Sequence, residues 1–151
     1  MKLFLALFLT FSIAHASECE IPLNETEFCI NIEWQEGPHL NQSAPRRPHM
    51  KHAMEQGKSI LLVTFYLKDD SSKAPLEIDG VKIYPWMTMG HHGHISKHNV
   101  ELLEGNVYKV SEMYFQEMMG SSNWAIRFGV AQQGEEYNYA SDFLTSVKII
   151  F

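Results

Sequence analysis

The sequence predicts an all-β protein, an immunoglobulin-like antiparallel β-sandwich of about seven strands. Three observations indicate this class. Apolar residues recur with a period of two, the segments rich in β-branched and aromatic residues are short, and turn-forming residues separate them. The 3.6-residue periodicity of an amphipathic helix does not recur along the chain.

Each strand is expected for a local reason. Residues 28–34 alternate apolar and polar side chains, which predicts a half-buried strand. Residues 60–66, ILLVTFY, have the composition of a central strand. In residues 76–84, Asp79-Gly80 is a turn signal, so this segment is expected to form two short strands or one strand entered from a hairpin. The other predicted strands are residues 107–115, 124–130 and 143–151.

Residues 1–16 have the organisation of a cleavable signal peptide. Lys2 is followed by an apolar stretch at residues 3–13 and by the small-x-small site Ala14-His15-Ala16. That stretch is shorter than the roughly 20 residues that span a bilayer. We therefore expect a periplasmic or secreted protein without stable membrane insertion, whose residues 17–151 form a single domain with a long irregular loop at 35–57.

Charge and cysteine content indicate which partners and which cellular compartment to expect. The chain has 12 basic and 18 acidic residues, a formal net charge of −6, so nucleic acid is not an expected partner. Its two cysteines, Cys19 and Cys29, are expected to form a disulfide in an oxidising compartment. The alternative is a pair of thiolate copper ligands.

The stretch YPWMTMGHHGH, residues 84–94, gathers thioether and imidazole groups without a charged side chain. Methionine sulfur selects Cu(I), while imidazole serves both copper oxidation states and zinc. We expect Gly90 and Gly93 to turn the chain so that several donors meet at one copper ion, Cu(I) or Cu(II). Trp86 is expected to pack at the base of this loop. The predicted ligands are Met87, Met89, His91, His92 and His94.

Two other loops carry similar donors. His49 and His52 lie in the 35–57 loop, and Met118 and Met119 precede the turn residues that open the 124–130 strand. If its loop folds beside residues 84–94, Met118 or Met119 is expected to complete the copper shell, and otherwise to cap the core. His49 and His52 would supply a ligand to the same ion or form a second, more labile site. The chain lacks the sequence motifs of common hydrolases, zinc proteases and phosphate-binding loops, so we do not expect an enzyme.

Three segments together resemble the YtkA-like/FixH-like domain, a small exported immunoglobulin-like sandwich. They are IYPWMTMGHHGH, LLEGNVYKV and MYFQEMMGSSNWAIRFGV, within residues 58–130. The residues that match its Met-Gly-His, Gly-x-Tyr and Met-x-Gly-x-Trp elements are Met87, Met89, Gly90, His91, Gly105, Tyr108, Met118 or Met119, Gly120 and Trp124. The resemblance implies periplasmic copper handling or assembly of copper-containing respiratory enzymes.

The sequence therefore favours a soluble periplasmic copper-binding protein that sequesters copper or passes it to an envelope protein. Two alternatives stay open. One is a metal-free interaction module that docks on an envelope partner. The other is a zinc or nickel site built from His91, His92 and His94, which would not depend on Met87 and Met89.

Overall fold

The computed structural model describes residues 19–41, 58–89, 92–116 and 123–151. These residues form eleven strands and no helix. The strands are β1 (Ile21–Pro22), β2 (Phe28–Glu36), β3 (Leu40–Asn41), β4 (Ser59–Leu67), β5 (Val81–Met89), β6 (His92–Ile95), β7 (Asn99–Leu103), β8 (Val107–Met113), β9 (Phe115–Gln116), β10 (Trp124–Val130) and β11 (Thr145–Lys148).

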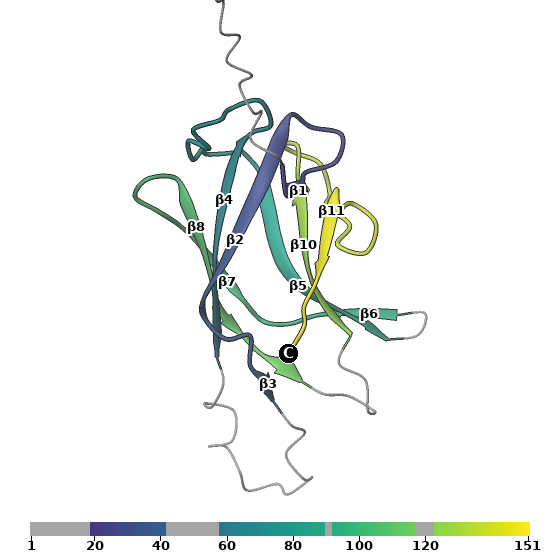
Figure 1. The fold of residues 1–151 in the computed structure, drawn as a ribbon. Helices are drawn as coiled ribbons and strands as arrows, with labels where there is room; N and C mark the ends of the chain where they lie inside the picture. Colours follow the sequence, from purple (N-terminus) through teal and green to yellow (C-terminus); the bar gives the residue numbers. More distant parts are fainter. Residues whose placement is uncertain (1–18, 42–57, 90–91, 117–122) are drawn as a thin grey trace, which may run out of the picture.

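Two antiparallel sheets face each other (Figure 1). One has the order β1-β2-β4-β8-β7 and the other the order β11-β10-β5-β6, while β3 and β9 form a short parallel pair. The series β2-β4-β8-β7 and β11-β10-β5 reproduces the A-B-E-D and G-F-C order of a seven-stranded immunoglobulin sandwich. The predicted fold class is confirmed, and β6 extends the second sheet by one edge strand.

The core lies between the sheets because their strands alternate inward and outward residues. Strand β4 buries Leu61, Val63 and Phe65, and strand β10 buries Ile126 and Phe128. The rings of Phe65 and Phe128 meet edge to face across the two sheets, with centroids 6.4 Å apart. Each such side chain contributes about 1.5–3 kcal/mol through burial, which stabilises the sandwich.

The expected strand at residues 76–84 is shifted in the structure. Asp79 and Gly80 form the predicted turn, and Gly80 has a φ of 69°, which glycine adopts without strain. Leu76 forms an isolated bridge with Phe65, so the long strand β5 begins only after the turn, at Val81, and continues to Met89. The strands β1, β3, β6, β7 and β9 were not predicted.

The N-terminal part of the fold contains the predicted disulfide. Cys19 and Cys29 are bonded, with their Cα atoms 5.8 Å apart. Because Cys29 lies opposite Pro22 in the β1–β2 pair, the disulfide fastens the N-terminal segment to the first long strand. The predicted signal peptide at residues 1–16 and most of the predicted 35–57 loop lie outside the described residues. Within the described ranges, no helix is long and apolar enough to cross a membrane.

Candidate functional site

Residues 92–95 form a strand, which corrects the expectation of a loop hinged at Gly90 and Gly93. In the β5–β6 hairpin, residues 81–95, Met87 lies opposite His94, Thr88 opposite Gly93, and Met89 opposite His92. Pairing with β5 satisfies the backbone polar groups of this stretch, which favours extended structure over an irregular loop. His91 and Gly90 lie outside the described residues.

Gly93 has a packing role within β6. A Cβ at this position would lie inside the indole ring of Trp86, which crosses β6 at this point. The missing side chain therefore allows Trp86 to lie flat on the hairpin, as expected for a packing residue at its base.

Met87 belongs to the hydrophobic core. Its exposed fraction is 1%, and it packs in the same cluster as Ile83 and Trp124. Residues of β5 alternate between two faces, so Ile83 and Met87 point into the sandwich while Tyr84 and Trp86 lie on its outer face. The Met87 thioether thus fills core space here and does not line an open loop, which differs from its predicted setting.

The other predicted donor segments begin and end beside this hairpin. Asn41, which precedes residues 42–57, lies opposite Gln116, which precedes residues 117–122. At the other end of the latter segment, the Asn123 carbonyl accepts a hydrogen bond of 3.0 Å from Thr88 N. Trp124 lies opposite Met87, and its indole N–H donates to Gln116 O.

These contacts bring the borders of three donor-rich segments to one end of the sandwich, where Figure 1 shows β3 and β6. His49, His52, Met118 and Met119 themselves lie outside the described residues. The side chains of Met89, His92 and His94 are also outside the description, although their strands are part of it.

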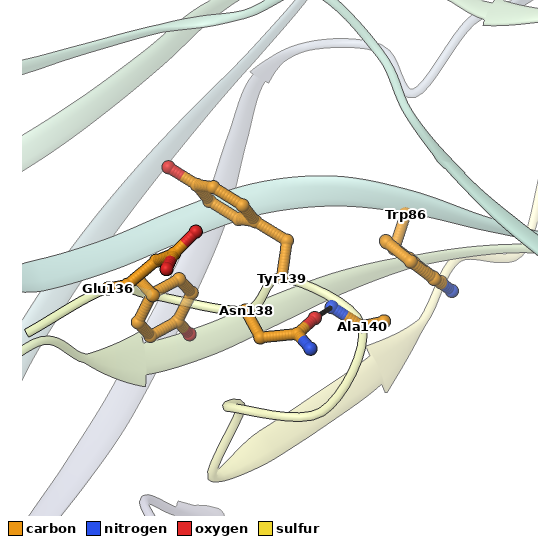
Figure 2. A pocket seen from close by; sticks show the side chains of 6 residues that line it. Trp86, Glu136, Asn138, Tyr139 and Ala140 are labelled. Carbon is orange, nitrogen blue, oxygen red and sulfur yellow. Dashed lines mark hydrogen bonds between the residues drawn. The ribbon is translucent and has the colours of Figure 1, made fainter.

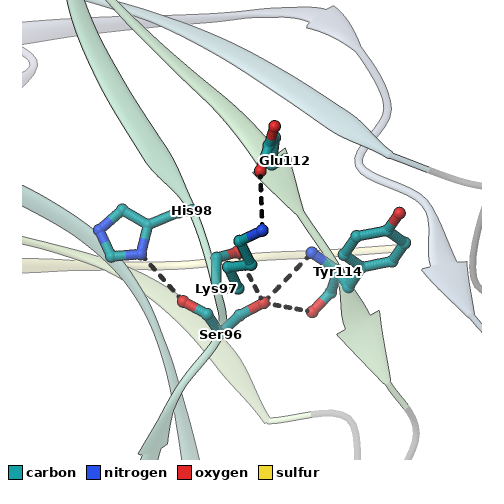
Figure 3. A network of polar contacts seen from close by, with 5 residues as sticks. All are labelled: Ser96, Lys97, His98, Glu112 and Tyr114. Atoms are coloured by element: carbon teal, nitrogen blue, oxygen red, sulfur yellow. Dashed lines mark hydrogen bonds and ion pairs between the residues drawn. The ribbon is translucent and has the colours of Figure 1, made fainter.

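A polar clamp fixes the connection that leaves β6 (Figure 3). The Ser96 hydroxyl, almost fully buried, donates to Tyr114 O at 2.9 Å and accepts from Tyr114 N at 3.2 Å. His98 Nδ1 lies 2.9 Å from Ser96 O, and because a carbonyl only accepts, this nitrogen carries the hydrogen. The Lys97 and Glu112 side chains form an exposed ion pair, 3.4 Å apart, which contributes little to the stability of the clamp. The clamp therefore holds the hairpin against the end of β8.

The outer face of the second sheet carries an aromatic cluster that the sequence analysis missed. The β10–β11 connection, residues 131–144, covers this face and is called the covering segment below. The Arg127 guanidinium lies 4.2 Å from the ring centroid of Trp86 and 3.8 Å from that of Phe143. Its Nη1 atom donates to the carbonyl oxygens of Tyr139 and Ala140. Arg127 therefore fastens the covering segment to the sheet.

Tyrosine rings complete this cluster. Tyr84, fully buried, meets the rings of Tyr137 and Tyr139 edge to face, and its hydroxyl donates to Tyr139 O at 3.0 Å. Burial raises the pKa of the Tyr84 hydroxyl. The pKa of Tyr137 is raised mainly by burial and, to a smaller extent, by the adjacent Tyr84 hydroxyl. Burial also lowers the pKa of Arg127. The cluster thus disfavours charge on these groups, and the aromatic repetition in EYNYASDF, residues 136–143, is the sequence signal that could have revealed it.

The part of the chain that the structure describes shows no cluster of carboxylate, thiolate or imidazole metal ligands. No group of three or more His, Cys, Asp or Glu side chains is positioned there to hold a metal ion.

Comparison with family models, curated proteins and solved structures found no match to this chain. The resemblance to the YtkA-like/FixH-like domain therefore stays a prediction from the motifs. The strand order nevertheless defines the class of protein as an immunoglobulin-like sandwich.

Proposed function

We propose that the chain is an exported copper-binding protein whose β5–β6 hairpin carries the copper ligands. The observation that supports this proposal is the register of the hairpin, in which Met89 lies opposite His92. Directly opposed residues of an antiparallel pair have Cβ atoms about 4.5–5.5 Å apart. A thioether position and an imidazole position are therefore neighbours across the hairpin, with His91 in the connection between them.

The donor chemistry of this pair suits copper. A thioether is a neutral, soft ligand that needs no deprotonation, and it favours Cu(I) over harder divalent ions. Neutral imidazole adds a ligand that copper accepts in both oxidation states. The proposed ligands on the hairpin are Met89, His91, His92 and His94. Since Met87 fills the core, it is assigned to packing.

Further ligands come from the two segments whose borders adjoin the hairpin. Met118 and Met119 lie between Gln116 and Asn123, whose backbone carbonyls bond to Trp124 and Thr88, respectively. His49 and His52 follow Asn41, which pairs with Gln116. These four residues are proposed to complete the copper shell.

The edge position of the hairpin supports release of the ion to a partner. Strand β6 is the last strand of its sheet, so a second protein approaching this edge reaches the hairpin without opening the core. We propose that copper moves by ligand replacement to an envelope protein. The signal sequence predicted at residues 1–16 would bring the chain to that compartment.

The test is copper titration of the exported chain. Cu(I) is titrated in competition with a chromogenic chelator, and the variant Met89→Leu/His92→Ala/His94→Ala is compared with the parent chain. We expect at least about a hundredfold weaker binding, since removing three ligands costs at least about 2.7 kcal/mol. Met87→Leu, which changes a core residue of the same hairpin, is the matched control and should bind copper as the parent does.

Equal copper stoichiometry and affinity in the triple variant and the parent would exclude the hairpin as the site. Competition with Zn(II) distinguishes the proposed copper site from a zinc site built from histidines. If zinc displaces copper and Met89→Leu has no effect on either metal, the site is a histidine zinc site.

A further inference from the structure

A hollow lies on the outer face of the second sheet, which faces away from the core. Its volume is about 600 Å³, and Figure 2 shows the side chains around it. The lining residues are Trp86 from β5 and Glu136, Tyr137, Asn138, Tyr139 and Ala140 from the covering segment. Small-molecule sites commonly have volumes of about 300–1,000 Å³, so the hollow is large enough for a small ligand.

The wall of this hollow is held in place by a dense set of backbone contacts centred on Asn138. Its N–H donates to an Asp142 carboxylate oxygen at 2.7 Å, and its carbonyl accepts from the N–H groups of Ser141 and Asp142. The Asn138 hydrogen bond, followed by that of the Ser141 hydroxyl, lowers the pKa of Asp142, which keeps this acceptor ionised. Arg127 and Tyr84 fix the next turn through Tyr139 O. A wall formed before the ligand arrives lowers the entropy cost of binding.

The orientation of the Asn138 amide is set by its own contact. Its Oδ1 atom accepts from Ala140 N at 3.0 Å, the bond drawn in Figure 2. Oδ1 must be the acceptor because a backbone N–H only donates, so the NH₂ group is the free end of the amide. Among the described residues, this group has no hydrogen-bond partner. The lining therefore offers a hydrogen-bond donor, the Asn138 NH₂ group, and an acceptor, the Glu136 carboxylate.

The lining disfavours a charged ligand of either sign, for two separate reasons. The Glu136 carboxylate would repel an anion. The indole face that a cation would use belongs to a ring that already has the Arg127 guanidinium 4.2 Å from its centroid. A neutral molecule with hydroxyl groups instead uses both polar groups, because each hydroxyl donates and accepts.

We propose that the hollow binds a neutral sugar. The apolar C–H face of a sugar ring packs on the aromatic wall, to which Tyr139, 38% exposed, contributes the accessible ring. Hydroxyl groups on the ring edge accept from the Asn138 NH₂ group and donate to Glu136. The site is independent of the proposed copper ligands, since it uses the outer face of β5 and the covering segment.

The experiment uses the full exported chain, labelled with ¹⁵N, and titrates it with glucose, galactose, N-acetylglucosamine and the cation tetramethylammonium. We expect saturable shifts at residues 136–140 and at the Trp86 indole N–H for at least one sugar, and none for tetramethylammonium. Because the hollow is open, the dissociation constant for a monosaccharide is expected on the order of 1 mM.

Variants of the lining make the result specific. Tyr139→Ala and Asn138→Asp should each weaken sugar binding by at least about tenfold, because one removes the ring and the other replaces the donor while keeping the acceptor for Ala140 N. Glu136→Gln keeps an acceptor and should weaken binding less than tenfold. Glu135→Gln, the neighbouring exposed carboxylate, is the matched control and should bind as the parent does.

Three results would overturn the proposal: saturable tetramethylammonium binding without sugar binding, the absence of saturable shifts with any of the sugars, or sugar shifts that persist unchanged in Tyr139→Ala and Asn138→Asp. Spectra of the variants without ligand establish that they are folded. Copper titration of the same variants should be unaffected, so failure of the sugar site and failure of the copper site are distinguishable.

Discussion

The β5–β6 hairpin and the covering segment are built on the two faces of one strand. In β5, Ile83 and Met87 point into the core, while Tyr84 and Trp86 point to the covering segment. The proposed copper ligands of the hairpin are neighbours in the sequence. The outer cluster gathers its rings because Arg127 of β10 lies between Trp86 and Phe143. One alternating strand therefore contributes to two separate surfaces.

The largest effect is expected for a change on the inward face of β5. Met87→Ala should lower the free energy of unfolding by about 3 kcal/mol, because it removes a buried side chain and leaves a cavity. Met87→Leu keeps the volume and should cost less than about 1.5 kcal/mol. Urea unfolding measures both. Loss of copper binding in a stable Met87→Leu variant would contradict the assignment of Met87 to packing, and the exposed Thr88→Ala is the control.

The second largest effect is expected where Gly93 of the hairpin packs against Trp86 on the outer face. Gly93→Ala should lower the free energy of unfolding by about 2 kcal/mol, because the new Cβ collides with the Trp86 ring. A double-mutant cycle with Trp86→Leu provides the check. If the collision is the cause, Gly93→Ala should cost much less in the Trp86→Leu background, whereas equal costs in both backgrounds would point to the backbone.

A smaller effect tests the anchor of the covering segment. Arg127→Lys keeps the charge but loses the planar group between two rings, and we expect a loss of about 1 kcal/mol. Hydrogen exchange at residues 138–142 should become faster while exchange in the core strands stays slow. Lys148→Arg, on the exposed surface of β11, should change neither measurement. Unchanged exchange in Arg127→Lys would show that other contacts hold the segment.

The smallest effect at neutral pH concerns the tyrosines. The folded-state pKa values of Tyr84 and Tyr137 are raised above the ordinary value of 10.0, so the unfolded chain loses these protons first as the pH rises. Their contribution to stability is therefore complete below about pH 10 and is lost at higher pH. Tyr137→Phe cannot ionise and should move the alkaline unfolding midpoint, measured by circular dichroism, to higher pH. A midpoint that stays constant or moves to lower pH would contradict this assignment.

Sequence patterns predicted the elements whose signal is local and missed those that depend on distant partners. The strands β2, β4, β8, β10 and β11 were predicted because alternation, β-branched and aromatic composition and turn signals are local properties of the sequence. Strand β6 was missed because two glycines and three histidines are typical of a loop, whereas pairing with β5 makes residues 92–95 extended. The outer cluster was missed because Trp86, Arg127 and Phe143 are far apart in the sequence.

Local sequence features were enough to predict the sandwich class, the disulfide between Cys19 and Cys29, and the presence of thioether and imidazole donors in one short stretch. These follow from composition, alternation and short-range spacing. Only the tertiary structure decided which face of β5 each residue joins, so that Met87 became a core residue and Trp86 part of a hollow. The physical reason is that burial and cross-strand register depend on partners distant in the chain, which no local pattern specifies.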